Sequence, residues 1–206
     1  MSPMIIEKVV AGPLETNAYL LGCEQTKKGI VIDPGKGSTE RLLLLIKKHD
    51  LVIEGIYLTH SHFDHIADVA RLKKEKGWPV YIHKEDAGNL KDPGSDGIPN
   101  MFGLEGVMPD GYLEDGEERN LGNMQFLVIH TPGHSFGGVC FYFVKEKALI
   151  SGDTLFRGTY GRTDLPTSSP EKMKASLEII RCLPDDVNVY PGHGGPTTIG
   201  REKKWL

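Results

Sequence analysis

The chain has 206 residues, a length that suits one large domain or two small ones and allows a substantial core. Hydrophobic residues make up 39% and charged residues 25%, and the formal net charge of -4 argues against a nucleic-acid-binding surface as the main function. No apolar run approaches the length of a membrane span, and residues 1–8 lack the features of a signal peptide. A cytoplasmic protein with no membrane partner is therefore expected.

The three cysteines, Cys23, Cys140 and Cys182, are widely separated and form no CxxC pair. This usage indicates neither a cysteine zinc site nor a disulfide framework. Each thiol is expected to fill a small apolar site in a reducing compartment.

In the first third of the chain, β-branched and apolar runs predict the strands 5–10, 18–21 and 29–32. A turn signal at residues 33–35 ends the third strand and leaves Asp33 at its carboxyl end. Next, Ser38 is the predicted N-cap of a helix that continues through residue 46.

A strand over residues 55–58 leads into a polar segment, and apolar residues at helical spacing then predict a helix that stops at Gly77. Asp64 and His65 are placed where this helix begins. Further along, strand-like runs occupy 79–83, 124–130, 138–144, 148–151 and 187–190. A helix capped by Ser169 precedes the last of them.

Two stretches, 91–111 and 152–168, show no regular pattern and are interpreted as loops. The first could form a substrate wall or an interface. The basic tail at 201–204 could contact an anion, although a solvated terminus is the preferred interpretation. No linker marks a boundary, so one α/β domain spanning residues 1–206 is predicted, and the oligomeric state is left open.

The segment 59–65, Thr-His-Ser-His-Phe-Asp-His, follows an apolar run and offers three imidazoles and a carboxylate. Nitrogen and oxygen ligands at this density are what a borderline-soft divalent metal takes. On this segment alone, a polar turn with a chance histidine cluster is the competing interpretation.

Three more candidates, His134, Asp153 and His193, each follow a strand-like run and a glycine. Loops at strand ends are where rigid scaffolds present functional side chains, and glycine lets the backbone approach a ligand closely. Strands of one sheet would bring these ends together. Three other histidines, His49, His83 and His130, lack this context and are interpreted as structural.

His60, His62, Asp64 and His65 form an HxHxDH motif, and His134, Asp153 and His193 follow it in order. The chain resembles the metallo-β-lactamase superfamily, and is most similar to its short glyoxalase II-like members without the C-terminal helical domain. The resemblance spans nearly the whole chain, from residues 12–14 and 17–19 to the segment 161–164. It implies a four-layer αββα sandwich of two mixed β-sheets flanked by helices.

The resemblance also implies the ligand sets. His60, His62 and His134 would hold one divalent ion, Asp64, His65 and His193 a second, and Asp153 would bridge the two. Zinc is the expected metal, and iron and manganese suit the same ligands. Asp33 is a candidate for orienting a ligand histidine, with a simple turn aspartate as the alternative.

Such a pair of ions implies a hydrolase in which a metal-bridging hydroxide attacks a thioester carbonyl, as in S-lactoylglutathione. Thioesters suit this chemistry because a thiolate leaves without prior protonation. Asp64 could also handle a proton after the attack. The substrate would be a small thioester, such as a glutathione conjugate, with no nucleic-acid partner.

Arg162 aligns with the family lysine that grips the glutathione carboxylate, so it is the substrate-binding candidate. Asp164 and Gly195 stand where the family has two substrate-binding tyrosines. Two of the three recognition positions are therefore altered, and the resemblance does not fix the substrate.

The alternative is a mononuclear iron persulfide dioxygenase of the same superfamily, which would use only His60, His134 and Asp153. A metal-binding protein without turnover is a third possibility. β-Lactam hydrolysis is disfavoured, because those enzymes generally lack a ligand histidine at the position of His65. A nuclease is disfavoured because the chain shows no strongly basic surface.

Overall fold

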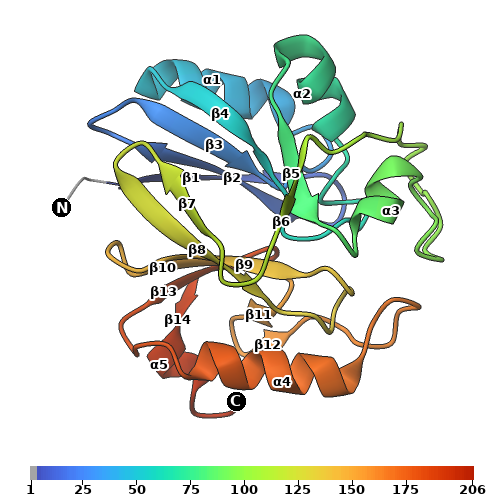
Figure 1. Cartoon of the computed structure of the whole chain (residues 1–206), viewed down its shortest axis with the longest axis vertical. Helices are drawn as coiled ribbons and strands as arrows, with labels where there is room; N and C mark the ends of the chain where they lie inside the picture. The colour runs from blue at the N-terminus through green and yellow to red at the C-terminus, as the bar shows by residue number, and fades with distance from the viewer. Residues whose placement is uncertain (1–3) are drawn as a thin grey trace.

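Two six-stranded sheets stack face to face, with helices on the outer side of each, in a computed structural model that describes residues 4–206 (Figure 1). Residues 1–3, part of the segment considered above for a signal peptide, lie outside that range. No helix among the described residues is long and apolar enough to cross a membrane. The four layers confirm the expected αββα sandwich.

The first sheet has parallel pairs from β3 to β6 and antiparallel pairs at its β1 side. Its strands, in spatial order, are β1 (Met4–Ala11), β2 (Thr16–Cys23), β3 (Lys28–Ile32), β4 (Val52–Tyr57), β5 (Val80–His83) and β6 (Gly111–Leu113).

The second sheet is antiparallel except for the parallel pair β10 and β13. Its strands, in spatial order, are β14 (Thr197–Thr198), β13 (Asn188–Pro191), β10 (Ala148–Gly152), β9 (Val139–Phe143), β8 (Met124–His130) and β7 (Glu118–Leu121). A separate two-stranded ribbon pairs β11 (Leu155–Phe156) with β12 (Thr159–Tyr160).

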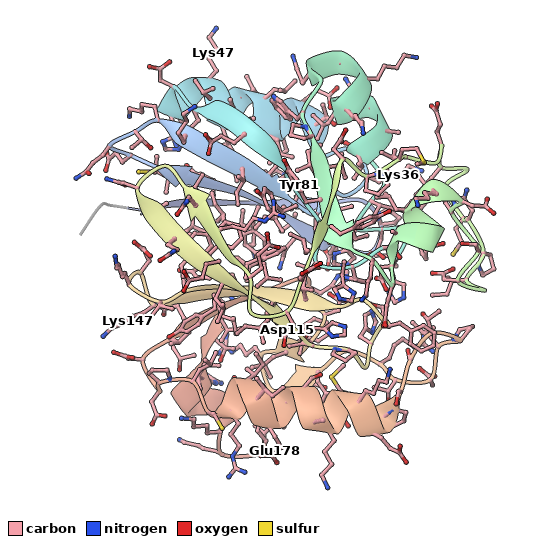
Figure 2. The ribbon with its side chains drawn as sticks, viewed as in Figure 1. Lys36, Lys47, Tyr81, Asp115, Lys147 and Glu178 are labelled. Carbon is pink, nitrogen blue, oxygen red and sulfur yellow. The ribbon has the colours of Figure 1, made fainter. Side chains whose placement is uncertain are left out.

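Five helices complete the chain: α1 (Thr39–His49), α2 (Val69–Lys76), α3 (Ala87–Lys91), α4 (Pro170–Arg181) and α5 (Ile199–Glu202). The first sheet carries α1 and α2 on its outer face, and the second carries α4 and α5 (Figure 1). Lys47 of α1 and Glu178 of α4 are exposed and point away from the molecule on opposite sides (Figure 2).

Period-two alternation along the strands supplies the three apolar layers that hold these elements together. In β2, Tyr19 and Leu21 face the other sheet, whereas Leu20 faces the helices of its own side. In β9, Phe141 faces the first sheet and Tyr142 packs toward α4 and α5. Both faces of each sheet are therefore buried, and the long strands match the apolar runs of the sequence.

The expected helix start at Asp64 is wrong, because α2 begins at Val69. The backbone N–H groups of His65 and Ile66 both donate to the His62 carbonyl, at 2.9 and 3.3 Å, which makes a separate turn. Asp64 and His65 therefore lie in an irregular segment between β4 and α2.

Ser38 occupies the N-cap position of α1, but its side chain makes no capping hydrogen bond. Instead, Asp68 accepts the Thr39 N–H at 3.0 Å and the Gly37 N–H at 3.0 Å. This buried carboxylate caps α1 from a distant part of the chain.

The expectation that each cysteine fills an apolar site fails for Cys182, which is exposed at the C-terminal end of α4. Cys23 and Cys140 are buried free thiols, as predicted. Seven described elements were not predicted: α3 and β6, at the two ends of the predicted loop 91–111; β7, between that loop and the predicted strand 124–130; β11 and β12, within the predicted loop 152–168; and β14 and α5, beyond the last predicted strand.

Candidate metal centre

The predicted ligands converge from four strand ends on the space between the two sheets. The segment 59–65 follows β4, His134 follows β8, Asp153 follows β10, and His193 follows β13. All seven side chains lie close together; they are His60, His62, Asp64, His65, His134, Asp153 and His193.

The first group contains His60, His62 and His134, and all three are buried. His62 Nδ1 lies 2.8 Å from His134 Nε2. The His60 ring centroid lies 4.6 Å from that of His62 and 5.0 Å from that of His134. Each residue offers one nitrogen, and these nitrogens lie within 4.8 Å of one another, so a single ion could contact all three.

The second group contains Asp64, His65 and His193. Asp64 Oδ2 lies 3.4 Å from His65 Nε2 and 3.3 Å from His193 Nε2, and the two nitrogens are 3.3 Å apart. A tetrahedral ion with bonds of about 2.0–2.1 Å separates its ligand atoms by roughly 3.3–3.4 Å. The three atoms are thus spaced as three corners of such a site.

Asp153 lies between the two groups. Its Oδ2 is 3.4 Å from His134 Nε2 of the first group, and its Oδ1 is 3.4 Å from His65 Nε2 of the second. Gly192 permits this position, because a Cβ there would lie 2.1 Å from Asp153 Oδ1. The glycine before His193 therefore has a steric role.

The residues present fit divalent ions. His60 Nε2 is buried and finds no hydrogen-bond partner among residues 4–206, and neither does Asp153 Oδ1. Buried polar atoms without partners are rare in folded proteins and indicate a missing ligand or ion. Together, the His/Asp clusters indicate a dinuclear metal site, and these ligand types do not fix the metal.

Burial, reinforced by neighbouring imidazoles, holds the pKa of His60 well below its usual range and lowers that of His62 to about 3. Against the effect of burial, Asp64 and Asp153 raise the pKa of His65. His60 and His62 are therefore neutral rings with a free lone pair. Around the second group, the carboxylates of Asp64 and Asp153 favour a positive charge, which a bound cation would supply.

Asp33 orients two of the histidines. Its Oδ2 accepts from His65 Nδ1 at 3.0 Å and from the Thr59 hydroxyl at 2.5 Å, while Oδ1 accepts the Thr59 N–H at 2.8 Å. Because the Thr59 hydroxyl donates to Asp33, its oxygen accepts from His60 Nδ1 at 3.0 Å. This chain of hydrogen bonds leaves the Nε2 lone pairs of His60 and His65 facing the centre.

Backbone carbonyls orient two further histidines, which the sequence analysis did not anticipate. His134 Nδ1 lies 2.9 Å from the Arg162 carbonyl, and His193 Nδ1 lies 3.0 Å from the Leu14 carbonyl. A carbonyl is present at every position, so no residue type signals such a contact in advance.

Side chains of strand β2 hold the His193 loop and the Asp64 carboxylate, a role that was not predicted from the sequence. The Thr16 hydroxyl donates to Asp64 Oδ2 at 2.6 Å. The Asn17 side chain donates to the Pro191 carbonyl at 2.8 Å, and the Tyr19 hydroxyl donates to the same oxygen at 2.7 Å. The available signal was the segment 17–19, which belonged to the family resemblance without an assigned function.

Arg162 carries the substrate-binding expectation, and its guanidinium lies on the surface. It pairs bidentately with Asp164, with Nε 2.7 Å from Oδ1 and Nη2 2.8 Å from Oδ2. Both side chains are largely exposed. Asp164, which replaces a family tyrosine, is therefore paired with the guanidinium that was expected to bind substrate.

His83, Glu85 and His130 form another cluster with ligand atoms close together. The two imidazoles are stacked, with centroids 4.1 Å apart and planes at 17°. An ion bound by a ring nitrogen lies in the plane of that ring, so stacked parallel rings cannot share one without turning. This geometry fits the structural role that the sequence analysis assigned to His83 and His130.

Comparisons with known proteins identify the family to which this chain belongs. The model of the metallo-beta-lactamase superfamily matches residues 11–193. The hydroxyacylglutathione hydrolase GloC of Haemophilus influenzae is 33% identical over 98% of this chain and 96% of its own length.

Two solved structures are similar over nearly their whole length. The crystal structure of BLEG-1 B3 metallo-beta-lactamase shares 37% identity, covers 97% of both chains and has a TM-score of 0.89. The crystal structure of TTHA1623 in a di-iron-bound form shares 41% identity, covers 95% of this chain and 96% of its own, and has a TM-score of 0.83.

The family match covers most of the chain, one of these relatives is named a hydrolase and another a metallo-beta-lactamase, and the strand ends that carry the His and Asp side chains meet at one centre. The protein therefore belongs to the metallo-beta-lactamase superfamily and is one of its metallo-hydrolases.

Proposed function

We propose that this protein is a binuclear thioester hydrolase that acts on small acylated thiols, of which S-lactoylglutathione is the first to test. His60, His62 and His134 would hold one ion, Asp64, His65 and His193 the other, and Asp153 would contact both. Two such ions about 3.5–4 Å apart ionise a shared water near neutral pH and polarise a substrate carbonyl.

The position of Asp153 is the single observation that carries the proposal. Its two carboxylate oxygens each lie 3.4 Å from a histidine nitrogen of a different group. A carboxylate in that position favours two ions working together over two independent sites. It also fits the family assignment, which was made from sequence.

The chain's own side chains would keep the centre rigid. Thr16 holds Asp64 Oδ2 at 2.6 Å, so this ligand carboxylate is fixed before any ion arrives. Asp64 is also our candidate for accepting a proton as the substrate reacts, because it is a buried carboxylate of the second group. Asp33 would set the orientation of His60 and His65 throughout.

Two observations support a thioester of an acidic thiol as the substrate. A relative that is 33% identical over nearly the full length carries the name hydroxyacylglutathione hydrolase. Arg162 offers an exposed guanidinium, and the backbone carbonyl of the same residue lies 2.9 Å from His134 Nδ1, so this side chain starts next to a proposed ligand. A substrate carboxylate would compete with Asp164 for it.

The mononuclear dioxygenase remains the competing function. It needs only His60, His134 and Asp153, whereas the Asp64, His65 and His193 atoms already have the spacing of a second site. This second group favours the hydrolase. The di-iron form of one relative makes iron the main competitor to zinc as the native metal.

The test uses natively purified full-length protein. Its metals are counted by elemental analysis, and S-lactoylglutathione hydrolysis is measured before chelation, after chelation and after zinc or iron is returned. About two ions per chain, with hydrolysis that is lost and restored together with them, is the expected result. One iron per chain with oxygen uptake on a persulfide would establish the dioxygenase instead.

A β-lactam is included as a second substrate, because the likeness to BLEG-1 runs against the expectation drawn from His65. Faster turnover of the β-lactam than of any thioester would overturn the substrate proposal. Two bound ions with neither activity would overturn it as well, while leaving the ligand assignment intact.

A further inference from the structure

Asp86 is a buried carboxylate with no role in the proposed ligand sets. It follows β5, is 4% exposed and occupies the N-cap position of α3. An aspartate there usually accepts a hydrogen bond from the first turn of its helix. Asp86 makes no such bond, so its carboxylate is directed elsewhere.

The carboxylate instead joins the two segments that carry the first group of histidines. Oδ2 accepts the Ser61 N–H at 2.9 Å, and Ser61 lies between His60 and His62. Oδ1 accepts the Gly137 N–H at 2.6 Å, three residues after His134. One side chain thereby bonds to both segments, which are more than 70 residues apart in sequence and would hold a single ion.

Ser61 is held from its other side as well. Asn89, also on α3, donates to the Ser61 carbonyl at 2.7 Å. Together, Asp86 and Asn89 satisfy the backbone N–H and C=O of the residue between two ligands. The peptide that sets the directions of His60 and His62 is thus fixed to α3.

Gly137 shows how close the contact is. A Cβ at this position would lie 2.7 Å from both the backbone nitrogen and Oδ1 of Asp86. Real Cβ atoms essentially never come this close to another atom, so any larger residue would push the 134–137 segment away from Asp86. The separation of the two ligand segments depends on this glycine as well as on the carboxylate.

We infer that Asp86 is a positioning residue that sets the distance between the 60–62 and 134–137 segments and thereby the affinity of the first ion site. The inference rests on the ligand assignment under the proposed function. Asp86 belongs to neither ligand group and would act through the backbone of the two segments that it joins. The two hydrogen bonds to its carboxylate are charge-assisted and therefore strong. Replacing Asp86 by the neutral asparagine should weaken them.

The experiment measures zinc affinity at the first site alone. In a His193→Ala background, which removes one ligand of the second group, the zinc dissociation constant is obtained by competition with a chromophoric chelator. Adding Asp86→Asn should raise this constant about 10–100-fold, the usual effect of losing support behind metal ligands. In a His62→Ala background, which isolates the second site, the same change should alter the constant by less than about threefold.

Asp68→Asn is the matched control. Asp68 is also buried and also accepts two backbone N–H groups, at 3.0 Å each, but it joins α2 to α1. Its substitution should lower the melting temperature without raising the zinc dissociation constant of the first site. If Asp68→Asn raises the zinc dissociation constant of the first site as much as Asp86→Asn does, the effect is a general loss of stability and the inference is wrong.

Circular dichroism of each metal-free variant reports whether it folds. Should Asp86→Asn fail to fold, Gly137→Ala provides the same test, because it leaves the carboxylate and its Ser61 bond in place. Unchanged first-site affinity in the folded variant would overturn the inference. Failure of the parent protein to bind two ions would instead overturn the proposed function, so the two failures are distinguishable.

Discussion

At the scale of single residues, hydrogen bonds from Asp33 orient two of the proposed ligand histidines. Asp33 accepts hydrogen bonds from Thr59 and His65. The Thr59 hydroxyl in turn accepts from His60, so Asp33 also orients His60. One carboxylate thus orients one histidine of each group. From the sequence alone, Asp33 is a candidate either for this role or for a simple turn aspartate, and its three side-chain hydrogen bonds favour the orienting role.

Asp33→Asn should weaken zinc binding at both sites by about 10–100-fold, because an amide cannot accept hydrogen bonds on both of its ends. Competition with a chromophoric chelator measures the effect, and the melting temperature of the metal-free variant controls for folding. A folded variant with wild-type affinity at both sites would contradict the role of Asp33.

Asp164→Asn should improve the binding of thioesters with an acidic thiol portion. The substitution weakens the bidentate pair on Arg162 and leaves the guanidinium open to a substrate carboxylate. Because both side chains are exposed, the pair itself is weak, and KM should fall severalfold with little change in kcat. Steady-state kinetics on S-lactoylglutathione check this, and an unchanged or higher KM would exclude Arg162 as the carboxylate partner.

His83 should make the free energy of unfolding depend on pH. Burial, with the stacked His130, lowers the pKa of His83 to about 4, against about 6.5 in an unfolded chain. The stabilising contribution is therefore complete above pH 6.5 and is lost as the pH falls toward 4. The urea midpoint of metal-free His83→Gln should drop less between pH 7 and 4 than that of the wild type. An equal drop of the urea midpoint in the two proteins would contradict the lowered pKa of His83.

At the scale of elements, long strands were predictable and short ones were not. The runs at 5–10, 29–32 and 124–130 each became a strand, because several alternating apolar residues carry a clear signal. Strands of two or three residues, such as β11 and β12, carry no periodicity at all. These two strands pair with each other across the turn at 157–158, outside both large sheets.

Tertiary contacts also explain the misplaced start of α2. Asp64 is drawn to the Thr16 hydroxyl and His65 to Asp33, at 2.6 and 3.0 Å. Local spacing predicted a helix there, whereas the partners of both side chains lie 48 and 32 residues away. A site that gathers distant ligands overrides the local preference of its backbone.

The C-terminal element α5 is held by a buried carboxylate. Glu202 is 1% exposed and accepts from the Thr197 hydroxyl, from the Gly158 N–H at 2.8 Å and from Trp205 Nε1 at 2.5 Å. The tail at 201–204, considered above for anion binding, thus contains a structural residue that joins β14, the β11–β12 turn and the chain end.

Glu202→Gln should lower the free energy of unfolding by about 1–3 kcal/mol, because the amide leaves at least one buried donor without an acceptor. Urea unfolding followed by circular dichroism provides the measurement. Zinc stoichiometry should not change, since Glu202 lies outside both ligand groups. A loss below about 0.5 kcal/mol would show that water replaces the carboxylate.

At the scale of the whole molecule, two mixed sheets bring strand ends from both halves of the chain to one centre. This convergence is predictable from the four strand ends that carry His or Asp, and the family match agrees with the fold. The supports of the centre could not be predicted, because carbonyls such as that of Leu14, and carboxylates such as Asp86, act through backbone geometry that residue types do not encode.

The most direct test of the two-ion centre is an anomalous difference map from crystals of the zinc-loaded protein. The predicted result is two peaks about 3.5–4 Å apart, one among His60, His62 and His134 and the other among Asp64, His65 and His193, with Asp153 in contact with both. A single peak in the first group, or a peak at His83 and His130 in place of the second, would contradict the two-ion assignment.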